Sequence, residues 1–463
     1  MFVLQNFYMT LLNLIFRITG KIDEKIRNRI VQFSLFFLSV DYFVWQSFSF
    51  FHIMISQTEK SIIGCGLLCF IIVMSIKEKL HKIKWNMFLW GIWSICSILI
   101  ILSGFLHVVG DGVRPLGFIM LFGFPCLYFV WNNRRDYETF FNWVAKAFMI
   151  TMVLYFVACI FVAPLEVTER FGFRYAATTH NPNRLGMLCA AAVSSCLYLY
   201  ANPKRNSWIY LFPCGIAVSF AFLSMSRASL LAIIVPVVLV AVFFIKNNDV
   251  FKMSRRGAVL KMMILVLGMV ICIPIVSTIL TTGNSVVGSA SEMISEKYVV
   301  FAQEENKSVA EDSYQEREKY LKDRLGTAGK DLNSLSSGRI EVWTYYLKHL
   351  NWWGHSMKSP TVEVGGVALY GAHNTPLDIG YRCGIIAGLF YLFIEIFAGV
   401  YIFKSLFTKS SRHKAAYNVF VVSAVSSFGI LSMLEIAIFP FDHAGVFLFF
   451  VALTPMFARR TTV

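Results

Sequence analysis

Three basic side chains stand out because of where they lie relative to the apolar runs of the chain. Arg227 occupies a short polar turn between two apolar segments, whereas Arg339 and His373 lie in the one long hydrophilic stretch. Two guanidinium groups can hold the oxygens of a diphosphate, because each presents a fixed fork of donors. A histidine beside them can take the proton of an attacking hydroxyl group. These residue types therefore favour a transfer reaction with an anionic leaving group.

The composition is that of a membrane protein. Of the 463 residues, 57% are hydrophobic and only 15% are charged. The apolar residues form runs long enough to cross a bilayer as helices, and the alternating segments of about ten residues typical of a membrane barrel are absent. We therefore expect an all-α polytopic membrane protein.

Twelve apolar segments are predicted to cross the membrane. They are residues 32–54, 61–76, 87–105, 115–131, 141–163, 184–200, 207–225, 228–245, 258–281, 384–403, 417–439 and 443–458. Four parts follow: a cytoplasmic interfacial helix with its basic flank (1–30), nine spans (31–281), an external helical loop domain (282–383) and three spans (384–463).

Basic residues are concentrated in alternate loops. One set of loops and the C-terminus carries Lys77, Lys79, Lys82, Lys84, Arg134, Arg135, Lys204, Arg205, Lys246, Lys252, Arg255, Arg256, Lys404, Lys409, Arg412, Lys414, Arg459 and Arg460. Because such loops stay in the cytoplasm, both termini are predicted to be cytoplasmic. Arg174, Arg227, Arg339 and His373 then face the outside. The net charge of +15 is read as an orientation signal, so no nucleic-acid partner is expected.

Local signals place two of these residues at helix starts. Ile340, Trp343, Leu347 and Leu350 recur at helical spacing, so Arg339 falls in the first turn of an amphipathic helix. Thr375 is a candidate N-cap with Pro376 at the first helical position. His373 would then lie at the positive end of a helix dipole, which favours the neutral imidazole that a general base needs.

Each residue also has an ordinary structural interpretation. Arg227 could be an interfacial charge, Arg339 a solvated helix residue and His373 a satisfied structural histidine. The ten cysteines lie in or beside apolar segments and suggest no metal cluster. His349 and His355 are six residues apart without a matching acid or thiolate, so neither a metal nor another cofactor is expected.

Several short motifs together resemble the O-antigen ligase and polymerase superfamily. They are Ser226-Arg227 between two spans, Gly338-Arg339 followed by Trp343, Ala372-His373-Asn374, the pair Arg170 and Arg174, the run His180 to Gly186, and the run Gly384 to Gly388. The order and sidedness of these motifs make the combination more specific than any one of them. The resemblance covers about residues 170 to 400 and the twelve-span layout.

The resemblance implies a GT-C type membrane glycosyltransferase that is metal-independent and inverting. Arg227 and Arg339 would hold the diphosphate of a polyprenyl-linked glycan donor, with Arg174 as a helper, and His373 would be the base. Asn374, His180 and Asn183 are supporting candidates, and His180 is an alternative base. Two departures from the family pattern are Arg382, where an acid is expected, and Gly354-His355-Ser356 in place of Gly-x-Gly. They put local salt bridging and loop geometry in doubt.

The expected partners are an undecaprenyl-diphosphate-linked oligosaccharide, a glycan acceptor and the lipid bilayer, with a chain-length regulator or a flippase as further candidates. The expected location is a bacterial cytoplasmic (inner) membrane.

Polymerisation of O-antigen or capsule-type repeat units is favoured, because the Phe, Ile, Lys and Asn bias suggests an organism without lipopolysaccharide. A ligase that transfers the glycan to a lipid or protein is the first alternative. The second is a flippase or transporter, supported by the intramembrane acids Asp41, Glu395 and Glu435 and by Asp442-His443.

Overall fold

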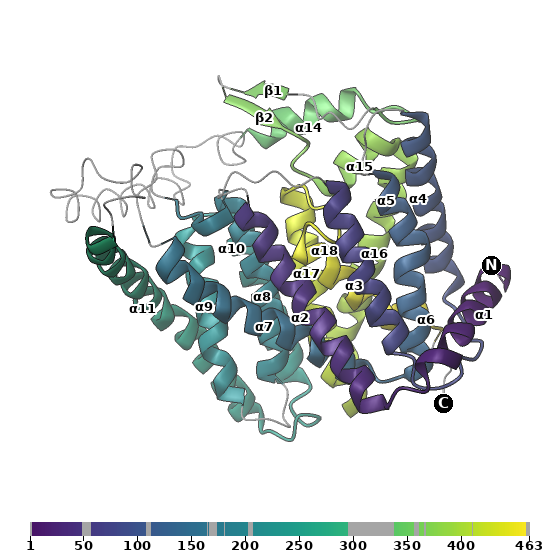
Figure 1. The fold of residues 1–463 in the computed structure, drawn as a ribbon, viewed down its shortest axis with the longest axis horizontal. Helices are drawn as coiled ribbons and strands as arrows, with labels where there is room; N and C mark the ends of the chain where they lie inside the picture. The colour runs from purple at the N-terminus through teal and green to yellow at the C-terminus, as the bar shows by residue number, and fades with distance from the viewer. Residues whose placement is uncertain are drawn as a thin grey trace.

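The protein is a bundle of long helices with a small layer of short elements at one end (Figure 1). The computed structural model describes residues 2–48, 57–107, 113–163, 165, 174–179, 181–201, 207–294, 338–355, 361–364, 367–409 and 411–459. Arg170 and His180 lie outside these residues, as does the part of the predicted external loop domain at 295–337.

The helices of the bundle follow the predicted spans closely. They are α1 (Phe2–Thr19), α2 (Glu24–Phe48), α3 (Gln57–Met74), α4 (Met87–Leu106), α5 (Val113–Phe118), the π-helix η1 (Ile119–Gly123), α6 (Phe124–Arg134), α7 (Tyr137–Val162), α8 (Pro182–Ala201), α9 (Leu211–Leu223), α10 (Arg227–Lys246), α11 (Arg255–Ile294), α16 (Ile385–Phe407), α17 (Arg412–Leu434), α18 (Ala444–Ala452) and α19 (Thr454–Phe457). Each predicted span overlaps one or more of these helices, and residues 49–54 of the first span lie outside the described residues. Within the described part of the chain, eight helices are long and apolar enough to cross a membrane. The all-α polytopic fold class is confirmed.

The short elements at the end of the bundle carry two of the candidate residues. They are α14 (Arg339–Lys348), the strands β1 (Thr361–Val364) and β2 (Val367–Tyr370), and α15 (Thr375–Cys383). The strands pair antiparallel, with Thr361 opposite Tyr370, and form a hairpin that the sequence analysis did not predict. As predicted, α14 begins at Arg339; it ends two residues before Leu350.

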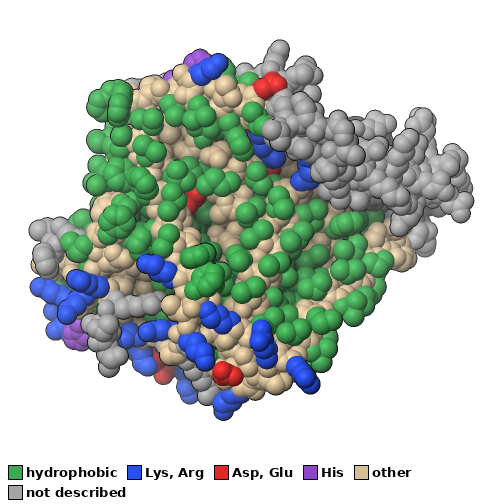
Figure 2. Space-filling view, turned by 180° about the vertical axis from the view of Figure 1, so that it is seen from behind, with side chains coloured by type: hydrophobic (Ala, Val, Ile, Leu, Met, Phe, Trp, Pro, Cys, Tyr) green, Lys and Arg blue, Asp and Glu red, His purple; other side chains and the backbone are tan. Residues whose placement is uncertain are grey.

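The two ends of the bundle differ in charge. Figure 2 shows Lys and Arg side chains gathered at the end of the molecule opposite to α14 and the hairpin, with green apolar surface between. This separation matches the alternation of basic loops in the sequence. Which end faces the cytoplasm stays a prediction.

The helix α8 occupies the centre of the bundle and leads to the candidate site. All its residues from Leu185 to Ala201 are buried, and it contacts α7, α9, α10 and α17. Small residues such as Ala190 and Ser194 allow this close approach, and the Ser194 hydroxyl donates to the Ser423 carbonyl of α17. The N-terminus of α8, with Asn183, is therefore held firmly at the end of the bundle that carries α14 and α15 (Figure 1).

Candidate functional site

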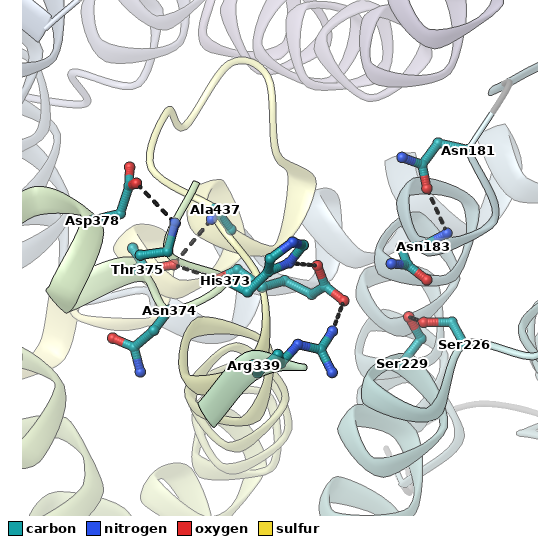
Figure 3. A network of polar contacts seen from close by, with 12 residues as sticks. Asn181, Asn183, Ser226, Ser229, Arg339, His373, Asn374, Thr375, Asp378 and Ala437 are labelled. Atoms are coloured by element: carbon teal, nitrogen blue, oxygen red, sulfur yellow. Dashed lines mark hydrogen bonds and ion pairs between the residues drawn. The ribbon is translucent and has the colours of Figure 1, made fainter. Parts of the chain in front are cut away.

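A buried carboxylate joins Arg339 to His373. The Nη2 atom of Arg339 lies 2.7 Å from Oε1 of Glu435, and Nδ1 of His373 lies 3.3 Å from Oε2 of the same side chain. Glu435 follows directly after α17 and is buried. In Figure 3 dashed lines join both His373, which lies just before α15, and Arg339, the first residue of α14, to one carboxylate between them. The sequence analysis considered Glu435 as an intramembrane acid that supports a transporter, or as a buried polar group paired with a neighbouring helix, and not as a partner of Arg339 and His373.

The backbone at His373 is held in an uncommon conformation. Its φ of 47° is in the left-handed region, which residues other than glycine rarely adopt. Gly371, two residues earlier, has a φ of 78°, and a Cβ there would lie 2.1 Å from Cδ1 of Ile436. Such conformations persist only where the surroundings enforce them, and they are common at functional sites.

The N-cap of α15 is Asn374, so the prediction that Thr375 caps this helix was wrong by one residue. The side chain of Asn374 accepts a hydrogen bond from the Leu377 amide at 2.9 Å. The Thr375 hydroxyl instead donates to the Glu435 carbonyl and accepts from the Ala437 amide, both at 3.0 Å. Asparagine caps at least as well as threonine, which leaves the hydroxyl to fasten the helix to residues 435–437.

A buried ion pair supports the same helix from within. Nε of Arg382 lies 2.5 Å from Oδ2 of Asp378, one turn earlier. Burial raises the pKa of the Asp378 carboxyl group, and the Arg382 charge opposes that rise. Asp378 also accepts a hydrogen bond from the Ala372 amide at 3.4 Å, next to His373. The expectation that Arg382 would weaken local salt bridging was therefore wrong, because its acidic partner lies in its own helix.

The loop after α14 contains Gly354, the first glycine of the Gly-x-Gly pattern expected there. Gly354 has a φ of 84°, and a Cβ there would lie 2.2 Å from the Arg382 carbonyl oxygen. His355 stacks on Tyr381 with ring centres 4.1 Å apart, and its amide donates to the Tyr381 carbonyl at 2.9 Å. These contacts fix the loop as far as His355, and Ser356, which stands in place of the second glycine, lies outside the described residues.

A second group of candidate residues gathers at the N-termini of α8 and α10. Arg174 donates from Nη2 to the Asn183 side chain at 2.6 Å and from Nε to the Ser224 carbonyl at 3.0 Å. Ser224 belongs to the short turn before Arg227, the first residue of α10. Figure 3 places Asn183 and Ser226 across from Arg339 and His373. The turn is packed tightly against α8, because a Cβ on Gly186 would lie 2.2 Å from the Ser229 hydroxyl oxygen.

Arg339 keeps a donor available. Its side chain is 14% exposed, and its Nε atom is buried without a hydrogen-bond partner among the described residues. An unmet buried donor costs about 1–3 kcal/mol, and more when it is charged. A bound anion would remove that cost, so this guanidinium is suited to an anionic ligand.

The other acids noted in the sequence are engaged in contacts of their own. Oε1 of Glu395 accepts from the Ser432 hydroxyl at 2.5 Å. Asp442 pairs with Lys60 at 2.8 Å, and its other oxygen lies 3.5 Å from Nε2 of His443. Pairing of buried acids is the ordinary structural interpretation of such residues.

Comparison with known proteins agrees with the motifs. No curated protein matches the chain. Residues 212–392 match the model of a protein family described as O-antigen ligase. The matched range runs from α9 into α16 and contains Arg227, Arg339 and His373, so the resemblance inferred from the sequence is confirmed. This part of the chain is therefore similar to the O-antigen ligase family.

Proposed function

We propose that this protein transfers an oligosaccharide from a polyprenyl diphosphate to a glycan acceptor at the outer face of a bacterial cytoplasmic membrane. The favoured reaction is the polymerisation of O-antigen or capsule-type repeat units. The observation that carries the proposal is the pair of contacts that Glu435 makes to Arg339 and His373. The Glu435 carboxylate contacts both His373, the proposed base, and the Arg339 guanidinium. The Nε atom of that guanidinium has no hydrogen-bond partner among the described residues.

His373 is the general base in this proposal. An Nδ1–H directed at the Glu435 carboxylate leaves Nε2 as the acceptor nitrogen of the neutral imidazole. The acceptor hydroxyl gives its proton to Nε2 while its oxygen attacks the anomeric carbon of the donor sugar. The bond from that carbon to the diphosphate oxygen breaks as the new glycosidic bond forms, so the anomeric configuration inverts. Glu435 orients the ring and stabilises the imidazolium that results.

The arginines stabilise the departing diphosphate. Arg339 and Arg227 are the first residues of α14 and α10, and Arg174 contacts Asn183 near the N-terminus of α8. Asn183 holds Arg174 in place, and Asn374 holds the start of α15. Guanidinium groups in a site sheltered from water can supply the positive charge that a metal supplies elsewhere. We therefore propose a metal-independent reaction in which Arg227 and Arg339 form the clamp and Arg174 assists.

A ligase is the second candidate, and the description of the matched family favours it. A ligase would use the same donor, clamp and base but would transfer the glycan to a different lipid or to a protein. The two reactions differ only in the acceptor. They are distinguished by supplying acceptors one at a time.

The test is an assay of the purified protein with a lipid-linked repeat unit in the presence of EDTA, with the products separated on a gel. A ladder that disappears in His373→Ala supports a metal-independent polymerase. Glycosylation of an added acceptor without a ladder supports the ligase. Movement of the lipid across liposomes without either product overturns the enzymatic proposal and supports a flippase.

A further inference from the structure

An apolar groove runs along α3 where this helix passes α5, η1 and α6. Its volume is about 540 Å³, and Ser61 is the one hydroxyl-bearing residue among the described residues that line it. From Ser61 to Val73 the groove follows α3 for about 18 Å, since a helix rises 1.5 Å per residue. Leu11 and Leu12 of α1 also line the groove. Its length exceeds half the hydrocarbon thickness of a bilayer, which is about 30 Å.

Small side chains and a widened helical turn make the groove deep. Cys65, Cys69 and Cys126 line it, and a Cβ on Gly123 would lie 3.1 Å from Cδ2 of Leu68. Gly123 ends the π-helix η1. Single π-helical turns inside a longer helix occur frequently at functional sites.

The widened turn is held open by its neighbours. The indole Nε1 of Trp93 donates to the Met120 carbonyl at 2.6 Å, and the Tyr8 hydroxyl donates to the Leu121 carbonyl at 2.8 Å. These bonds satisfy carbonyls within the π-helical segment. The groove is therefore a built feature that involves α1, α3, α4 and η1.

One end of the groove is polar. Ser61 is 3% exposed, and its hydroxyl oxygen has no hydrogen-bond partner in the described part of the chain. An unmet buried hydroxyl costs about 1–3 kcal/mol, so a ligand oxygen at this position is favoured. The preceding residue, Lys60, contacts Asp442 at 2.8 Å.

This polar end continues toward the candidate site. Oδ2 of Asp442 lies 3.5 Å from Nε2 of His443. The charge of Glu435, the side chain that contacts Arg339 and His373, acts electrostatically on the His443 imidazole. Arg184 also acts on both Asp442 and His443. The cations Lys60 and Arg184 therefore lie between the polar end of the groove and the candidate site, where they can attract an anionic group.

We propose that the groove binds the polyprenyl chain of the diphosphate-linked donor, with Lys60 and Ser61 contacting the phosphate oxygens where the chain begins. The proposal rests on the proposed function and assigns a place for the lipid half of its substrate. A chain seated along α3 holds the diphosphate near the arginines and lowers the entropy cost of positioning it.

The test uses a glycan-free polyprenyl diphosphate that carries a photoreactive group in the middle of its chain, added to the full-length protein in nanodiscs. We expect cross-links to peptides from α3 and residues 118–126. Cys69→Trp, which fills the groove, is expected to reduce the yield about tenfold, equivalent to about 1.4 kcal/mol. The matched control is Phe70→Trp, because Phe70 is 55% exposed and lies outside the groove lining.

A second readout does not depend on the bulky variant. Ser61→Ala is expected to weaken binding of the same probe several-fold without changing the peptides that are labelled, because one contact to phosphate is lost. Cross-links on other helices, or equal labelling of Cys69→Trp and Phe70→Trp, would each overturn the proposal. Groove cross-links in a wild-type protein that transfers no glycan would uphold the groove and overturn the proposed function instead.

Discussion

The hydroxyl group of Thr375 donates a hydrogen bond to the backbone carbonyl of Glu435 at 3.0 Å. Through this bond the first residue of α15 is fixed to the residue whose side chain contacts His373, the proposed base, and Arg339, part of the proposed clamp. The same hydroxyl accepts from the Ala437 amide. His373 and Glu435 are therefore aligned by the backbone as well as by their own contact.

We expect Thr375→Val to destabilise the protein. Valine has nearly the shape of threonine but leaves the Glu435 carbonyl and the Ala437 amide without their partner, which costs about 1–3 kcal/mol per buried group. The measurement is thermal unfolding in detergent, and Thr375→Ser, which keeps the hydroxyl, should unfold near the wild-type temperature. Equal midpoints for Val and Ser would contradict the anchoring role.

Gly371→Ala should also destabilise the protein. The left-handed φ of 78° costs about 1–2 kcal/mol for a residue with a Cβ, and the new methyl group would meet Ile436. Gly399→Ala is the control, because a Cβ on Gly399 meets nothing within 4 Å. Circular dichroism during heating compares the two, and the opposite order of stability would refute the strain argument.

Glu435→Gln should lower kcat while donor binding persists. The glutamine keeps the shape of the side chain but cannot stabilise the imidazolium or fix the ring as firmly, and misplacement of a base by about 1 Å can cost about 100-fold. Single-turnover kinetics give the rate, and cross-linking of a polyprenyl diphosphate gives the binding. If the variant lost donor binding while its transfer rate stayed unchanged, Glu435 would act through Arg339 and not through His373.

Arg339→Lys should impair transfer although the positive charge is kept. A lysine cannot contact both Glu435 and a diphosphate oxygen with a planar fork, so a loss of at least about tenfold in kcat/KM is expected. Arg256→Lys, near the start of α11, is the control and should have wild-type activity. Normal turnover by Arg339→Lys would remove Arg339 from the clamp.

His373→Ala should abolish transfer and leave donor binding intact. Removal of a general base typically costs about 100- to 10,000-fold in rate, while the arginines stay in place. Titration with a fluorescent polyprenyl diphosphate measures binding separately from transfer. A variant that no longer binds the donor would show that His373 also positions the diphosphate.

The bundle was predictable because its signals are local in the sequence. Apolar runs such as 87–105 and 385–403 indicate their own helices, and the basic loops separate one end of the molecule from the other. The start of α14 at Arg339 followed from the spacing of apolar residues. The β1–β2 hairpin was missed, because each strand has only four residues.

Glu435 was noticed in the sequence but given the wrong context. It lies 62 residues after His373 and 96 after Arg339, and no spacing rule connects positions so far apart. A buried acid near the end of an apolar run signals a functional or paired group without naming its partner. The positive φ of His373 likewise depends on the packing of Gly371 against Ile436, which no local pattern reveals.

The position of Glu435 also determines which segments must be exchanged together to move the proposed active centre into another protein. The family domain spans residues 212–392, whereas the carboxylate that holds its histidine comes from the segment after α17. A chimera that exchanges only the matched domain would join a base from one parent to an acid from the other. To transfer donor specificity, such a chimera should therefore exchange the matched range and the last three spans together.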